Sequence, residues 1–132
     1  MTRKFLIVPL MLTVAVGSIA FAQEQSKAVK VKGYLIDNMC AGEPGEDKDY
    51  EAEAKGHAIS CALMPHCAKT GFAVAEGKKL YPLDAAGNKL AENALKSTKA
   101  PKSQKGLLVE VEGTLDGSTL RATKLTEVAA GK

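Results

Sequence analysis

Short segments of the chain alternate apolar and polar residues, which is the pattern of a β-strand with one buried face. The first is VKVKGYLIDNMC, where Val29 and Val31 begin the alternation. Gly33 inside the segment predicts a bulge or bend, and we expect the strand to end near Asp37. The segments GFAVAEG and KKLYPLD predict two more strands, of which the second contains a proline and is expected at an edge or bulge.

Two further strands and two helical segments complete the pattern. LLVEVEGTLDGSTLRATKLTEV predicts a hairpin that turns at Asp116-Gly117. AAGNKLAENALKS predicts a short helix with one apolar side. After the first strand, the acidic loop AGEPGEDKDYEAEAKG leads into a helix that we expect to reach about Leu63, to break at Pro65 and to stop at Gly71.

The predicted fold is mainly β. The order is strand, helical insert, strand, strand, short helix, strand, strand, which matches a small five-stranded barrel of the oligonucleotide/oligosaccharide-binding (OB) type. The insert then follows strand 1 and the short helix precedes strand 4. An α+β roll with the same elements is the alternative.

The first 22 residues predict a secretory signal peptide. Arg3 and Lys4 precede an apolar run, and Ala20-Phe21-Ala22 supplies the small residues of a cleavage site. Residues 23–132 are then a single exported domain, periplasmic or secreted from a bacterium, with no membrane contact after cleavage.

The charge and the missing motifs exclude several function classes. The net charge of +3 includes Arg3 and Lys4, so residues 23–132 carry 16 basic and 15 acidic residues. This balance, without tryptophan, argues against nucleic acid as a partner and leaves a small ligand or a protein partner open. We find no phosphate-binding glycine loop and no common hydrolase or haem motif, which argues against an ordinary enzyme.

Candidate chemistry concentrates in HAISCALMPHC, residues 57–67. The chain has three cysteines and two histidines, and Cys40 alone lies outside this stretch. Cys40, His57, Cys61 and Cys67 together form a sulfur and nitrogen set that suits zinc. Adding the Met64 thioether gives a set of softer ligands, which copper(I) prefers.

The spacing of these residues along a helix indicates which of them share one face. In a continuous helix, His57 and Cys61 lie four residues apart on one face, whereas His66 is expected at the surface. Asp37 is expected to form a turn or to cap the following segment. The more specific alternative is that Asp37 accepts a hydrogen bond from the His57 imidazole and so orients it.

Two other interpretations of the cysteines stay open. An exported protein favours disulfides, so Cys40 could pair with Cys61 or Cys67, or Cys61 with Cys67. The chain would then be a stapled structural or interaction domain with any ligand on the barrel face. A thiol redox protein that uses a free cysteine, with Cys61 beside His57, is the third interpretation.

GYLIDNMCA, HAISCALMPHCAKTGFAVAEGKKLYPLD and LLVEVEGTLDGSTLRATKL together resemble a group of small exported bacterial proteins. The resemblance implies an OB-like barrel with a Cys/His-bearing insert and the pattern H-x3-C-A-L-M-x2-C, but no substrate or reaction. Together with the residue pattern, it leads us to expect a small exported non-catalytic binding module whose Cys/His cluster holds zinc or copper.

Overall fold

The computed structural model describes residues 26–43, 45 and 47–129. The predicted signal peptide, residues 1–22, lies outside them. Within the described part, no helix is both long enough and apolar enough to cross a bilayer.

Five antiparallel strands form one sheet in the order β3-β2-β1-β4-β5. Each predicted strand is present, and the predicted turn at Asp116-Gly117 joins the last two. Pro82 ends an edge strand, as expected. The strands are β1 Ala28–Asp37, β2 Phe72–Glu76, β3 Lys79–Pro82, β4 Leu107–Asp116 and β5 Thr119–Glu127.

The predicted barrel is not confirmed, because the sheet is not closed by a ladder of hydrogen bonds between its edge strands. Beyond the end of β3, Leu83 forms a single isolated parallel bridge with Leu120 of β5. The Asp84 amide donates to the Leu120 carbonyl at 3.1 Å. The two edges therefore approach each other at one point.

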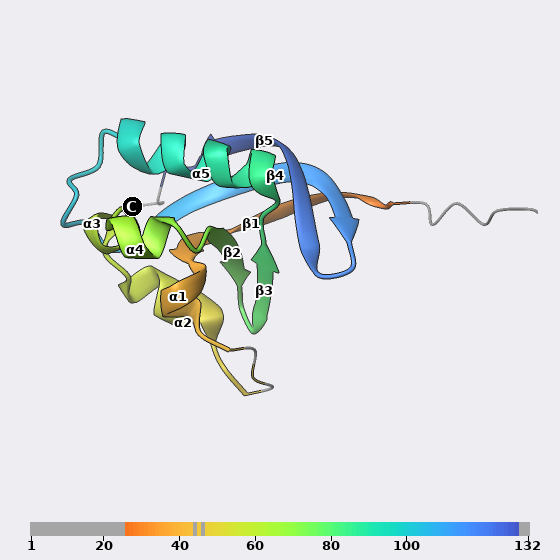
Figure 1. Cartoon of the computed structure of the whole chain (residues 1–132), viewed down its shortest axis with the longest axis horizontal. Coiled ribbons are helices and arrows are strands. Elements are labelled where there is room, and N and C mark those ends of the chain that lie inside the picture. Colours follow the sequence, from red (N-terminus) through yellow and green to blue (C-terminus); the bar gives the residue numbers. More distant parts are fainter. Residues whose placement is uncertain (1–25, 44, 46, 130–132) are drawn as a thin grey trace, which may run out of the picture.

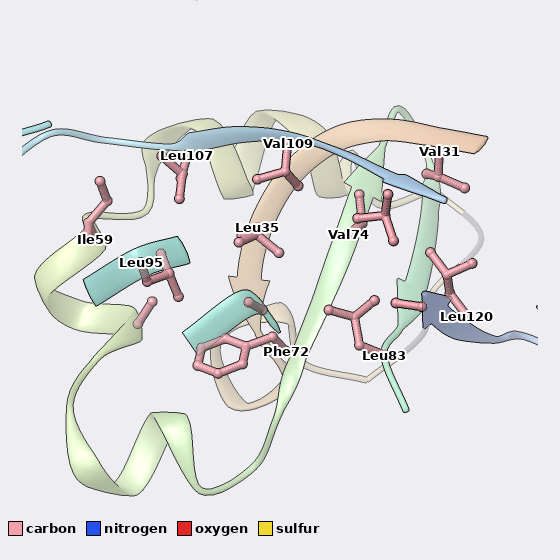
Figure 2. Close-up of a cluster of buried hydrophobic side chains, with 14 residues drawn as sticks. Val31, Leu35, Ile59, Phe72, Val74, Leu83, Leu95, Leu107, Val109 and Leu120 are labelled. Atoms are coloured by element: carbon pink, nitrogen blue, oxygen red, sulfur yellow. The ribbon is translucent and has the colours of Figure 1, made fainter. Parts of the chain in front are cut away.

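Helices cover both faces of the sheet (Figure 1). The main core, on the side of α5, joins α3 and α5 to all five strands or their ends (Figure 2). A smaller core on the other face contains Ile36 with Tyr50 and Ala54 of the insert. The helices are α1 Asn38–Ala41, α2 Tyr50–Gly56, α3 Ile59–Ala62, α4 Pro65–Ala68 and α5 Ala85–Ser97.

The two cores explain the burial of the central strands. Leu35 faces the main core and Ile36 faces the smaller one, so successive residues of β1 are both buried. Four of the five residues of β2 are buried as well. Strict alternation of apolar and polar residues is therefore lost where the insert covers the sheet.

The insert follows strand 1 and the helix α5 precedes strand 4, as predicted, but the expected continuous helix to Leu63 is wrong. The chain leaves the helical conformation at His57 and Ala58. There the backbone pairs with the loop before β4: Ala58 bridges Lys105, and the Gly106 amide donates to the His57 carbonyl at 2.9 Å. Long-range pairing thus overrides local helical preference.

The helix stops were predicted correctly. Pro65 occupies the first turn of α4, where its missing N–H costs no helical hydrogen bond. Gly71 has a φ of 83°, in the left-handed region that favours glycine, and it separates α4 from β2.

Gly33 allows β1 to approach β2 closely. A Cβ at this position would lie 2.2 Å from the carbonyl oxygen of Ala75. No register shift occurs between β1 and either neighbouring strand, so of the predicted bulge or bend the bulge is absent, and Gly33 allows close packing of backbones.

We expect Gly33→Ala to lower the free energy of unfolding by about 1–3 kcal/mol, because the added methyl group overpacks the sheet. Gly56→Ala is the matched control, since nothing lies within 4 Å of a Cβ there. Urea denaturation of both variants measures the effect. Equal stability of the two variants would show that β1 and β2 separate easily.

Candidate metal centre

Asp37 is the last residue of β1 and the only buried polar or charged side chain among the residues that the structure describes. Its Oδ1 accepts a hydrogen bond from the Cys40 amide at 2.9 Å and so caps α1. This short turn therefore places the Cys40 side chain close to the buried Asp37 carboxylate.

The imidazole of His57 reaches this carboxylate from the end of α2. Its Nε2 lies 2.8 Å from Asp37 Oδ2, and the His57 side chain is 14% exposed. The distance is that of an ion pair, yet neither atom makes a hydrogen bond of acceptable geometry within the described structure. Burying two such atoms without a hydrogen bond is costly, and a cation bound between them is one way to satisfy both.

The loop before β4 holds His57 in place. Besides the bond from the Gly106 amide to the His57 carbonyl, the Ile59 amide donates to the Gln104 carbonyl at 3.1 Å and the Ser60 amide donates to the Lys102 carbonyl at 2.9 Å. These backbone bonds fix the chain at His57 and on its C-terminal side. The helix break that sequence reasoning missed is therefore the feature that positions the histidine.

Cys40 completes a group of three different donors. One ligand atom each from Asp37, Cys40 and His57, an oxygen, a sulfur and a nitrogen, all lie within 4.8 Å of one another. These residues come from the end of β1, from α1 and from the end of α2. A metal ion is the cation that all three atoms could share.

Cys67 borders this group from α4. It is buried, with an exposure of 4%. Thr70 connects the two helices: its hydroxyl accepts from the Met39 amide at 3.1 Å and donates to the Cys67 carbonyl at 2.7 Å. Helix α1 is thus docked on the end of α4 (Figure 1).

The structure brings part of the predicted ligand set together. Cys40 and His57 belong to the three-residue group, and Cys67 lies beside it. Cys61 is half-buried and outside the group, and the helical phase that linked it to His57 does not exist. His66 is exposed, as expected.

Asp37 is the member of the group that sequence reasoning did not name as a ligand. Its expected role as a cap of α1 is present, and its Oδ2 lies 2.8 Å from His57 Nε2, although the two atoms do not meet the geometry of the expected hydrogen bond. The signal that could have identified it is its position at the end of a buried strand, three residues before a cysteine.

All three cysteines are free, and no pair lies at bonding distance. The disulfides considered from the sequence are therefore not found.

Burial raises the pKa of Cys40 to about 12, and the nearby Asp37 carboxylate contributes to this shift. The pKa of Cys67 is also raised, first by burial and then by Asp37. Both thiols are therefore protonated at neutral pH. Reactive cysteines show the opposite shift.

The chain matches no known protein-family model, no curated protein and no solved structure. The resemblance to exported bacterial proteins remains a prediction from the sequence. Function is therefore inferred from the chemistry of the site.

We expect alkylation of Cys40 by iodoacetamide to be slow at pH 8 and to accelerate about tenfold per pH unit toward pH 11, because only the thiolate reacts. Peptide-resolved mass spectrometry measures the rate for each cysteine. The urea-unfolded chain is the control, and its rate should level off near the ordinary pKa of 9.0. A folded protein that levels off at the same pH would show that Cys40 is not shielded.

Proposed function

We propose that this protein is a small exported, non-catalytic metal-binding domain that holds zinc through Asp37, Cys40 and His57. The observation that carries the proposal is the group of three donors, one ligand atom each from Asp37, Cys40 and His57, all within 4.8 Å of one another. Asp37 Oδ2 and His57 Nε2 are buried and lie 2.8 Å apart. Export is part of the proposal because of the signal-peptide pattern in residues 1–22.

The donor types and spacing suit zinc. Zinc binds imidazole nitrogen and carboxylate oxygen at about 2.0 Å and thiolate sulfur at about 2.3 Å, so ligand atoms on one tetrahedral zinc lie about 3.3–3.6 Å apart. Asp37 Oδ2 and His57 Nε2, 2.8 Å apart, would have to separate slightly to bind one zinc ion. The Cys40 sulfur belongs to the same group of ligand atoms, which lie within 4.8 Å of one another. The fourth position is left to water or to Cys67.

Charge balance also favours a divalent ion. The Asp37 carboxylate is fully buried, and a buried charge without compensation is strongly unfavourable. Binding zinc would deprotonate Cys40, and the two negative ligands would then neutralise the ion. This supports zinc above a monovalent ion at this set of three donors.

At Cys40, a binding role is favoured over thiol catalysis. The raised pKa of Cys40 keeps its sulfur protonated, whereas a nucleophilic cysteine needs a thiolate at neutral pH. A bound metal ion would stabilise the Cys40 thiolate by taking the place of the proton.

We also propose that the sheet is an incompletely closed OB-type barrel. The strand order, the helix between β3 and β4, and the single bridge between Leu83 and Leu120 support this relation. The metal centre would then lock the insert onto the outside of the barrel, at the end of β1.

We expect the purified protein to bind about one zinc ion per chain, as measured by competition with a chromophoric chelator. His57→Asn and Asp37→Asn should each weaken binding by more than the roughly 100-fold that loss of a supporting hydrogen bond can cost. Asparagine at position 37 preserves a residue that can cap α1.

His66→Asn is the matched control, because His66 is exposed and outside the group. It should bind zinc as the unaltered protein does. The zinc proposal fails if the unaltered protein binds no zinc, or if the His66 variant is impaired as strongly as the His57 variant.

Zinc should also raise the thermal stability of the protein. An ion that binds the folded chain alone stabilises it by about 2.7 kcal/mol at 100 times its dissociation constant. Thermal melts in increasing zinc, followed by circular dichroism, should show a rising Tm that a chelator reverses. The same rise in the His57→Asn protein would place the stabilising ion elsewhere.

A further inference from the structure

A cleft of about 520 Å³ lies between the end of α2, the loop that connects α5 to β4, and the end of β5. Its volume falls within the range of about 300–1,000 Å³ that is typical of small-ligand sites. Its described lining residues include none of the three proposed zinc ligands. The cleft is therefore separate from the proposed metal centre.

Three apolar side chains form one wall of this cleft. Tyr34 of β1 pairs with Leu108 of β4, and the Val128 amide donates to the Leu108 carbonyl at 2.8 Å. Because residues directly opposite each other in antiparallel strands share a face of the sheet, the three side chains form an apolar row. All three are half-buried and line the cleft. The row therefore offers apolar surface that the described chain leaves partly uncovered.

Two lysines border the cleft. Lys55 Nζ lies 5.2 Å from the centre of the Tyr34 ring and 2.8 Å from Glu51 Oε1. Lys105 is exposed and belongs to the loop before β4. A lysine places its methylene stem along apolar surface while its ammonium group stays in water. Positive charge thus lies next to the apolar row.

Glu127 is the one acidic residue among the described residues that line the cleft. Its carboxylate accepts a hydrogen bond from the Thr98 hydroxyl at 2.9 Å, so it is engaged with the end of α5. The two lysines outnumber it. The charge of the cleft therefore favours an anionic group in a ligand.

The loop before β4 is fixed where it forms the cleft. Gly106 has a φ of 70°, and a Cβ there would lie 2.9 Å from Tyr34 Cδ1 and 3.1 Å from Lys55 Cα. The Gly106 amide donates to the His57 carbonyl on the side of the insert. Since the loop is packed this closely against β1 and α2, the cleft is preformed, as small-ligand sites usually are.

We propose that this cleft binds a small organic anion with an aromatic or branched apolar body, such as a carboxylate or a sulfonate. The apolar body lies on the row of Tyr34, Leu108 and Val128, and the anionic group meets Lys105 and Lys55. This binding goes beyond the proposed metal function and does not depend on it.

The test is a fluorescence titration of the folded full-length protein with two probes. One is anilinonaphthalene sulfonate, an aromatic anion, and the other is phenylnaphthylamine, the same ring system without the sulfonate. About one molecule of the anion should bind per chain, more tightly than the neutral probe. Lys105→Gln should weaken binding of the anion about threefold to fivefold and leave the neutral probe unaffected, because the lost ammonium lies at the edge of the cleft. Lys69→Gln is the matched control, since Lys69 is exposed and outside the cleft.

Val128→Ala tests the apolar row. It should weaken both probes by about threefold to tenfold, because two methyl groups are lost from the contact surface. Ala100→Leu is a second variant that fills the cleft and should also weaken both probes. Its control is Ala52→Leu, at an exposed position of α2 that does not line the cleft. Circular dichroism verifies the fold of each variant.

The proposal is overturned if the folded protein binds no probe, if several molecules bind per chain, or if Lys69→Gln weakens the anion as strongly as Lys105→Gln does. Zinc binding is measured on the same preparations, and the probe titration is repeated with a chelator. A protein that binds the anion but no zinc would refute the proposed function alone. One that binds zinc but no anion would refute this inference alone.

Discussion

The buried carboxylate of Asp37 is the constraint on which the rest of the centre depends. One oxygen caps α1, which places Cys40, and the other oxygen faces His57. A fully buried carboxylate needs both contacts, because each unsatisfied oxygen is costly in the interior. Strand β1, helix α1 and the end of α2 are therefore positioned around one side chain.

This arrangement also explains why the insert packs on the sheet as it does. Ile36, adjacent to Asp37, anchors the smaller core against Tyr50 and Ala54. The apolar contacts hold α2 close, and the loop before β4 turns the chain at His57 so that its imidazole reaches the carboxylate. Hydrophobic packing thus brings the helices together, whereas the polar contacts select the residues that meet.

The strands could be predicted because their signals are local. Alternation over β1 and the Asp116-Gly117 turn depend on neighbouring residues and on turn chemistry. The break of the helix at His57 could not be predicted, because the backbone there pairs with residues more than 40 positions later. The pairing of His57 with Cys61 was based on a continuous helix, so it lost its basis as well.

The site could be predicted only in part, because residue type identifies some of its members but not all of them. Cys40 and His57 were recognisable as uncommon side chains capable of ligation. Asp37 looked like an ordinary turn residue, and it is one, since it caps α1. Its second role depends on burial and on the approach of His57, which are properties of the folded chain.

The place of β1 in the sheet has a consequence for the order of folding. This strand lies at the middle of the sheet but near the start of the described chain, and Ala28 to Leu35 pair with β4, from Thr114 back to Leu107. Contacts between such distant residues slow folding, because a long loop must close before they form. The ladder between β1 and β4 can form completely only after residue 114 has been synthesised, whereas α1 and α2 follow β1 directly along the chain.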